Sequence, residues 1–286
     1  MPGRADINCP VSQYLSALLL AAPLIKTPAS YSPNATTLGV LHLNEAPYVE
    51  MTLDWLKQSH IRYEQNGWKQ FCIPANQHYK PFEKEIPADW SSAMFFMAAA
   101  AITQSTLFLR GLNLNDSQGD KAVTAMLEKM GCRIREVKSA GVSQGIEISG
   151  APLQGAVHNL NATPDALPGM AAVCAFAQGE SRLKGVPQAR LKETDRIAVM
   201  CAELAKLGAE TEELPDGIII RGTSPGRALR GCTVDGHNDH RVVMALAAAA
   251  LGCEGHTDIT GAEAAAVTFP EFFKLLEQAR NAKDNT

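Results

Sequence analysis

Apolar stretches recur along this chain at a nearly constant spacing, and each follows an aspartate and precedes a glycine. Asp89, Asp165 and Asp239 are 76 and 74 positions apart, and each has a glycine 20 or 22 residues further on. Between each aspartate and its glycine lie an Ala-rich apolar run and a short strand-like segment. Recurrence at a fixed period indicates repeated structural units. The pattern predicts apolar helices over residues 91–102, 170–177 and 242–251, each followed by a strand.

The second half of each unit repeats as well. Residues 127–131 match residues 204–208, where an apolar helical pattern ends on a glycine and a strand follows. Residues 145–150 match residues 217–222 as a closing strand. The unit is therefore β-α-β-α-β-β and about 75 residues long. The last copy ends early, with its second helix over residues 270–280.

A less regular copy precedes these three. It has predicted helices over residues 12–22 and 47–57 and strands over 61–64 and 69–73, and its first strand is missing or reduced to residues 7–9. The polar, proline-containing stretch 75–87 is typical of a linker. We predict an α/β (α+β) fold with a partial first domain over residues 1–86 and a complete three-unit domain over 87–286.

Composition narrows the class of protein. The chain of 286 residues is 46% hydrophobic and 20% charged, with a net charge of −4, which is ordinary for a globular protein and argues against a general nucleic-acid binder. Its seven cysteines form no C-x-x-C pair, which fits a reducing cytosol. The most apolar runs, 14–25 and 94–102, are too short to span a bilayer. We expect a cytoplasmic protein that binds neither nucleic acid nor membrane.

One charged cluster stands out against this background. Lys192-Glu193-Thr194-Asp195-Arg196 directly precedes a helical apolar pattern, which places the charges on the first turn of a helix, where anions are favoured. A solvated helix start, with the carboxylates neutralising the cations, is the simpler interpretation. Among the equivalent positions of the preceding unit, 115–119, only Asp116, opposite Glu193, is charged. Since the repeated scaffold does not need them, a functional role is favoured.

Further candidates occupy the starts of other helices. Asp239, in Asn238-Asp239-His240-Arg241, is expected to cap its helix, whereas Arg241 has no such duty and could reach an anion. Asp165 is either a helix cap or an acid/base group. Ser12 and Gln13 are either cap and surface residues or donors to a polyol.

If these helix ends converge, they form a site for an anionic substrate. Lys192, Arg196 and Arg241 would clamp the anion, with Glu193 and Asp165 as acid/base candidates. The chain contains no P-loop, no Gly-rich dinucleotide fingerprint and no serine-nucleophile elbow. We therefore expect proton transfer and electrostatics without a cofactor or metal.

Several segments together resemble one enzyme family, the 5-enolpyruvylshikimate-3-phosphate synthases (3-phosphoshikimate 1-carboxyvinyltransferases). In family order, these are residues 11–19, 47–53, 89–93, 117–120, 164–165, 191–196, 238–241 and 268–272. The resemblance implies the enolpyruvyl transferase fold, with two domains of three units each. It also implies transfer of the enolpyruvyl group of phosphoenolpyruvate to the 5-hydroxyl of shikimate-3-phosphate with release of phosphate. This is a step of the shikimate pathway toward chorismate and the aromatic amino acids.

The resemblance also implies roles for single residues. Asp165 and Glu193 would be the proton-transfer pair, and Lys192, Arg196 and Arg241 would bind phosphoenolpyruvate. The groups expected to contact shikimate-3-phosphate are Ser12, Gln13, Gln188, Asp165 and Lys192.

Four departures from the family pattern accompany these roles. Family members are longer at the N-terminus, and Val11 stands where many members have a serine. Glu45 stands where a serine is common, and Val267 stands where some members have a lysine. We expect a truncated or split synthase that needs a complementing N-terminal fragment or an oligomer. Two alternatives remain: the sister transferase acting on UDP-N-acetylglucosamine, and a non-catalytic repeat scaffold that binds anions.

Overall fold

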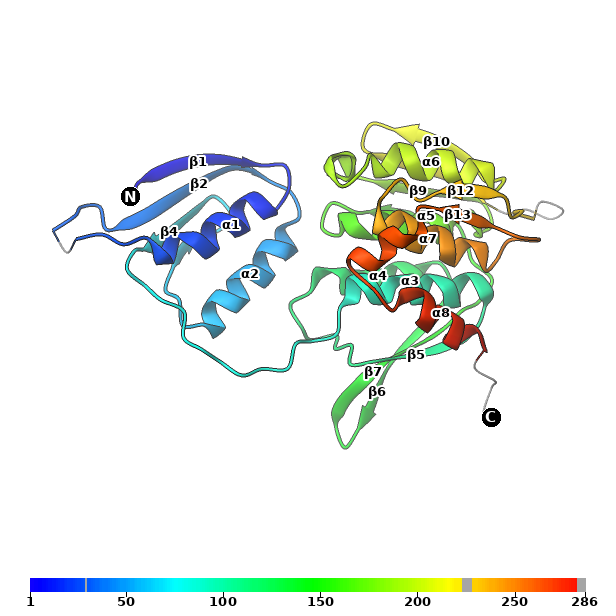
Figure 1. Ribbon diagram of the computed structural model, residues 1–286, viewed down its shortest axis with the longest axis horizontal. Helices are drawn as coiled ribbons and strands as arrows, with labels where there is room; N and C mark the ends of the chain where they lie inside the picture. Colours follow the sequence, from blue (N-terminus) through cyan, green and yellow to red (C-terminus); the bar gives the residue numbers. More distant parts are fainter. Residues whose placement is uncertain (29, 223–227, 282–286) are drawn as a thin grey trace. The chain divides into compact units, whose positions relative to one another are not determined.

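A computed structural model describes residues 1–28, 30–222 and 228–281 (Figure 1). The chain divides into two compact units, which are described separately. Unit 1 comprises Met1–Ile86 with Asp116–Gly119, and unit 2 comprises Pro87–Asn115 with Asp120–Thr286. Whether they correspond to a partial and a complete domain of the family stays a prediction.

Unit 1 is a single four-stranded sheet with two helices. Its elements are β1 (Arg4–Cys9), α1 (Gln13–Ala21), the 3-10 helix η1 (Ala22–Leu24), β2 (Ala35–Leu43), α2 (Ala46–Gln58), β3 (Glu64–Asn66) and β4 (Gln70–Pro74). The strand order is β1-β2-β4-β3, with β1 parallel to β2 and the other pairs antiparallel. Leu15, Leu53 and Phe71 belong to its buried core, in which apolar faces of both helices meet the sheet. The unit is thus a full β-α-β-α-β-β copy.

Three expectations for this copy were wrong. The strand expected over residues 61–64 is β3, which begins only at Glu64. The first strand is neither missing nor confined to residues 7–9, because β1 has six residues and pairs along β2, a strand that the sequence pattern did not reveal. Gly39 interrupts the apolar alternation of β2. A Cβ built there would lie 2.0 Å from Asp6 Oδ1, the end of a half-exposed side chain of β1.

Unit 2 holds the other repeats. Its elements are α3 (Trp90–Thr103), β5 (Thr106–Arg110), η2 (Gly119–Ala122), α4 (Val123–Lys129), β6 (Arg133–Ser139), β7 (Val142–Ser149), β8 (Val157–Asn159), η3 (Pro164–Ala166), α5 (Leu167–Ala175), β9 (Glu180–Lys184), η4 (Pro187–Leu191), α6 (Arg196–Lys206), β10 (Glu210–Leu214), β11 (Gly217–Arg221), β12 (Thr233–Asp235), α7 (His240–Ala250), β13 (Asp258–Thr260), η5 (Ala262–Val267) and α8 (Phe272–Asn281).

The middle copy of unit 2 repeats the topology of unit 1. Its strand order is β10-β11-β9-β8, with β8 parallel to β9 and the remaining pairs antiparallel. The described residues on either side form smaller sheets, β5-β7-β6 and β12-β13. The predicted glycine ends of α4 and α6 are confirmed: Gly131 and Gly208 have φ of 113° and 102°.

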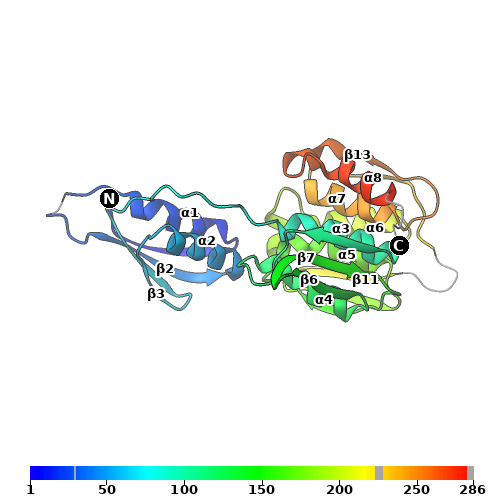
Figure 2. The same cartoon turned by 90° about the horizontal axis from the view of Figure 1, so that it is seen from below.

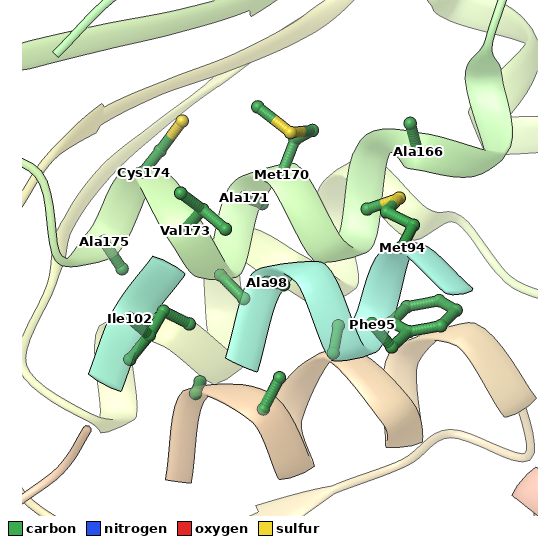
Figure 3. Close-up of a cluster of buried hydrophobic side chains, with 14 of the residues drawn as sticks. Met94, Phe95, Ala98, Ile102, Ala166, Met170, Ala171, Val173, Cys174 and Ala175 are labelled. Atoms are coloured by element: carbon green, nitrogen blue, oxygen red, sulfur yellow. The ribbon is translucent and has the colours of Figure 1, made fainter. Parts of the chain in front are cut away.

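The three predicted apolar helices are confirmed as α3, α5 and α7, and they pack side by side in the centre of unit 2 (Figure 2). Met94 and Phe95 of α3 and Met170 and Val173 of α5 belong to the buried core around these helices (Figure 3). A helix that is apolar around most of its circumference is stable only when it is buried on most sides. Burial on most sides therefore accounts for the continuous apolar runs of these helices.

Within the described ranges, no helix combines the length and the apolar character that crossing a bilayer requires.

Candidate active site

The charged motif lies at the start of α6, but not where the sequence pattern placed it. Asp195 is the N-cap, and its carboxylate accepts a hydrogen bond from the backbone N–H of Ala198. The helix therefore begins at Arg196, and Lys192 and Glu193 precede it instead of lying on its first turn. The prediction that the charges of this motif lie on the first turn of the helix was wrong for Lys192 and Glu193, because the helix starts only after the Asp195 cap.

The two other aspartates differ in their local roles. Asp239 caps α7 as expected, since its Oδ1 accepts from the backbone N–H groups of Arg241 (2.8 Å) and Val242 (3.3 Å). Asp165 caps no helix: it lies inside η3, which Pro164 opens, and makes no side-chain cap bond. Its carboxylate is therefore available to other partners.

The guanidinium of Arg196 joins three carboxylates from separate segments. Its Nε donates to Asp239 Oδ2 at 2.7 Å, its Nη1 to Asp165 Oδ1 at 2.9 Å, and its Nη2 to Glu193 Oε2 at 2.6 Å. The Arg196 side chain is 1% exposed and that of Asp239 is fully buried, whereas Glu193 is 48% exposed. Burial would lower the pKa of Arg196, but the hydrogen bond with Asp239 and the surrounding carboxylates raise it. Arg196 is therefore a fixed cation at the centre of the cluster.

Two further cations reach Asp165. Arg241 Nη2 lies 3.1 Å from Asp165 Oδ2, and Lys192 Nζ lies 3.5 Å from Asp165 Oδ1. Burial would raise the pKa of Asp165, but Arg241, then Lys192 and Arg196, outweigh that effect and hold the pKa below its ordinary value. Asp165 is consequently ionised at neutral pH.

Sequence reasoning missed three groups that complete this cluster. Asp239 is the principal partner of Arg196, and Ser91, at the start of α3, accepts a hydrogen bond from Arg241 Nη1. The Nδ1 atom of His240 lies 3.9 Å from Glu193 Oε1, and burial, followed by the charge of Arg241, lowers the pKa of this histidine. The sequence Asn238-Asp239-His240-Arg241 showed that charged side chains gather at this helix start. Which side chains they bind follows only from the contacts between helices.

Five of the eight predicted site residues meet in this cluster: Asp165, Lys192, Glu193, Arg196 and Arg241. Gln188 lies buried in η4, where its Nε2 donates to the backbone carbonyl of Asn161 at 3.1 Å. Ser12 and Gln13 belong to unit 1.

In unit 1, the Ser12 hydroxyl donates to Glu45 Oε2 at 2.7 Å, and the Ser12 N–H donates to the same atom at 3.0 Å. Gln13 is exposed as the first residue of α1. The Ser12 hydroxyl is thus committed to a buried carboxylate in this structure.

No group of three His, Cys, Asp or Glu side chains that could hold a metal ion occurs in the part of the chain that the structure describes. The cluster around Arg196 combines three cations with three carboxylates, side chains of the types that can bind an anion and transfer protons.

The sequence of the chain matches a known protein family. The family described as EPSP synthase (3-phosphoshikimate 1-carboxyvinyltransferase) matches residues 3–276. The chain belongs to this family.

Curated relatives in the EPSP synthase family carry the same name. A 3-phosphoshikimate 1-carboxyvinyltransferase of Ruminiclostridium cellulolyticum is 48% identical over 275 residues, which are 96% of this chain and 61% of the relative. That of Acetivibrio thermocellus is also 48% identical, over 96% of this chain and 62% of the relative. The chain thus spans about three fifths of the length of these relatives.

Solved structures agree with the fold. The EPSP synthase of Acinetobacter baumannii matches with a TM-score of 0.76 at 24% identity, over 97% of this chain and 62% of that structure. The enolpyruvyl transferase NikO of Streptomyces tendae matches with a TM-score of 0.67 at 18% identity, over 86% and 55%. The predicted enolpyruvyl transferase fold is confirmed.

Proposed function

We propose that this chain carries the proton-transfer and phosphoenolpyruvate-binding groups of a 3-phosphoshikimate 1-carboxyvinyltransferase. The reaction would transfer the enolpyruvyl group of phosphoenolpyruvate to the 5-hydroxyl of shikimate-3-phosphate and release phosphate. The observation that carries the proposal is the convergence of Lys192, Arg196 and Arg241 on Asp165 in a member of the EPSP synthase family.

Proton transfer is assigned to Asp165 and Glu193. Addition of the 5-hydroxyl to phosphoenolpyruvate removes a proton from oxygen and places one on the methylene carbon, giving a tetrahedral adduct. Loss of phosphate and of a methyl proton restores the double bond. Asp165 is held in the ionised form, which can accept a proton, by three cations, and Glu193 lies on the exposed side of the cluster.

Phosphoenolpyruvate binding is assigned to Lys192, Arg241 and Arg196. In this structure each guanidinium nitrogen of Arg196 is bonded to a carboxylate, and only Glu193 among those carboxylates is substantially exposed. An incoming carboxylate or phosphate would therefore displace Glu193 from Arg196. Substrate binding would thereby free Glu193 for proton transfer.

Shikimate-3-phosphate is assigned to Ser12, Gln13 and Gln188, together with Asp165 and Lys192. The support is the position of these residues in segments that resemble the family. Ser12 would exchange its bond with Glu45 for one with the ligand. This exchange predicts weaker binding than a free hydroxyl would give.

Activity is also proposed to need chain segments that the relatives have and this sequence does not show. The test measures phosphate release from phosphoenolpyruvate and shikimate-3-phosphate. The chain is assayed alone and with the N-terminal segment of the Ruminiclostridium cellulolyticum relative, and UDP-N-acetylglucosamine replaces shikimate-3-phosphate in a parallel reaction. Release that depends on shikimate-3-phosphate supports the proposal, whereas release with the nucleotide sugar would favour the sister transferase.

Binding provides a test that does not depend on turnover. Shikimate-3-phosphate is titrated calorimetrically into the wild-type chain, Lys192→Ala, and the control Lys274→Ala, which removes an exposed lysine of α8. We expect Lys192→Ala to weaken binding and Lys274→Ala to leave it unchanged. Equal binding by all three chains would refute the assignment of Lys192. Binding of inorganic phosphate as tight as that of shikimate-3-phosphate, without enolpyruvyl transfer, would favour a non-catalytic scaffold.

A further inference from the structure

Helix α6 contacts the segment before α7 at two points. Arg196, at the start of α6, binds Asp239, and Glu203, seven residues later on the same face, binds residues 235 and 237. Seven residues of α-helix span about 10 Å. The short segment from Asp235 to Asp239 is therefore bound to α6 at both ends.

The Glu203 end of this arrangement is a buried carboxylate outside the cluster around Arg196. The Glu203 side chain is 2% exposed, and its Oε2 accepts a hydrogen bond from the backbone N–H of Asp235 at 2.9 Å. Its Oε1 lies 3.0 Å from His237 Nε2, and Lys206 Nζ lies 2.8 Å from both oxygens. Burial would raise the pKa of Glu203, but the bonds with Lys206, His237 and Asp235 lower it, so the carboxylate is ionised and His237 Nε2 donates.

The segment that Glu203 binds has an unfavourable backbone conformation. His237 and Asn238 have φ of 49° and 54°, two consecutive non-glycine residues in the left-handed region. Such residues persist only where their surroundings hold them. The preceding Gly236 packs closely, because a Cβ built there would lie 2.3 Å from Val243 Cγ2.

The surroundings that hold this turn are specific hydrogen bonds. The His237 N–H donates to Asp235 Oδ1 at 2.7 Å, the Gly236 N–H donates to Thr260 O at 2.9 Å, and the Asp239 N–H donates to Gly236 O at 2.9 Å. From α6, Glu203 adds hydrogen bonds to the backbone of Asp235 and to the side chain of His237. The turn leads directly into Asp239, the buried partner of Arg196.

We propose that Glu203 and His237 are positioning residues: they fix the left-handed turn so that Asp239 holds the Arg196 guanidinium in one orientation. Neither residue touches the cluster around Arg196 in the contacts described above. They act through the backbone of residues 235–239 and through Asp239. The consequence for phosphoenolpyruvate binding rests on the function proposed above, whereas the orientation of Arg196 does not.

The orientation can be read from the Nε–H resonance of Arg196 in proton–nitrogen NMR spectra of the full chain, assigned by its loss in Arg196→Lys. A buried Nε–H bonded to Asp239 exchanges slowly with water. We expect Glu203→Gln and His237→Ala to shift this resonance and to speed its exchange about tenfold or more. His237→Gln, which retains a side-chain N–H donor, should restore slow exchange.

The matched control is Glu147→Gln, the same chemical change at a carboxylate that binds Arg135 in the β5-β7-β6 sheet. It should leave the Arg196 resonance unchanged. If Glu203→Gln does not fold, the pair His237→Ala and His237→Gln decides, because the His237 side chain is 36% exposed. An unchanged Arg196 resonance in folded His237→Ala overturns the proposal.

A kinetic readout addresses the function separately. Where enolpyruvyl transfer is measurable, His237→Ala should raise the KM for phosphoenolpyruvate with a smaller change in kcat, and His237→Gln should reverse the change. A shifted Arg196 resonance with an unchanged KM would keep the positioning role and refute the assignment of Arg196 to phosphoenolpyruvate.

Discussion

Replacing Asp239 with asparagine tests whether the cluster is organised around the buried pair of Asp239 and Arg196. Asparagine has nearly the same shape and keeps one carbonyl oxygen, which can still cap α7 and accept one bond from Arg196. The variant loses the negative charge and the second acceptor opposite a guanidinium that is almost fully buried.

The expected magnitude follows from the partners that remain. Breaking a buried ion pair by removing one partner costs about 3–5 kcal/mol, and a hydrogen bond to a charged group contributes about 1.5–3 kcal/mol. Arg196 retains Asp165 and Glu193, which reduces the loss. We expect Asp239→Asn to lower the free energy of unfolding of unit 2 by about 2–4 kcal/mol. Asp239→Ala should cost about 1 kcal/mol more, because the cap is also lost.

The measurement is urea unfolding followed by the fluorescence of Trp90, which is buried in unit 2. The other two tryptophans, Trp55 and Trp68, are replaced by phenylalanine in every chain compared, so that the signal reports unit 2 alone. Asp258→Asn, at an exposed aspartate of β13, is the control and should leave the midpoint unchanged. A loss below about 0.5 kcal/mol for Asp239→Asn would refute the reasoning, because surface substitutions have effects of that size.

Three further outcomes are expected. The folded-state pKa of Asp165 lies below its ordinary value of 3.8, so the wild-type chain should lose stability relative to Asp165→Asn as the pH falls below about 4. A constant difference between the urea midpoints of the two chains down to pH 2 would contradict this. Burial lowers the pKa of His158 from 6.5 to about 4, so wild type should lose stability relative to His158→Gln as the pH falls from 6.5 to 4, and equal pH profiles would contradict it. Phe272→Ala removes a fully buried ring that packs against Phe95 and Phe96 and should lower the free energy of unfolding by about 3–5 kcal/mol in the same assay. Phe273→Ala, at an exposed ring, is the control and should cost less; equal losses would contradict the packing argument.

The sequence predicted the helices that are apolar on nearly every side. For helices with a mixed pattern of apolar and polar residues, it predicted the glycines at which they end. Helices α3, α5 and α7 were found from the sequence because burial on most sides demands a continuous apolar run. The ends of α4 and α6 were found because Gly131 and Gly208 adopt positive φ. Strand β2 was missed because Gly39 breaks its pattern of apolar positions.

The sequence alone determined the repeated units, the charged motif and the types of side chain available for binding an anion and moving a proton. These follow from local composition and from periodicity, which a single chain displays without reference to its neighbours. Tertiary structure decided which charges are partners. Asp165, Arg196 and Asp239 lie more than 30 residues apart along the chain, and only the packing of their helix ends brings them within hydrogen-bonding distance. The same packing made Asp165 a partner of cations instead of a helix cap, and it buried Arg196 so that its charge organises the carboxylates around it. A pKa and an ion pair depend on distance and burial, and these quantities exist only once the chain has folded.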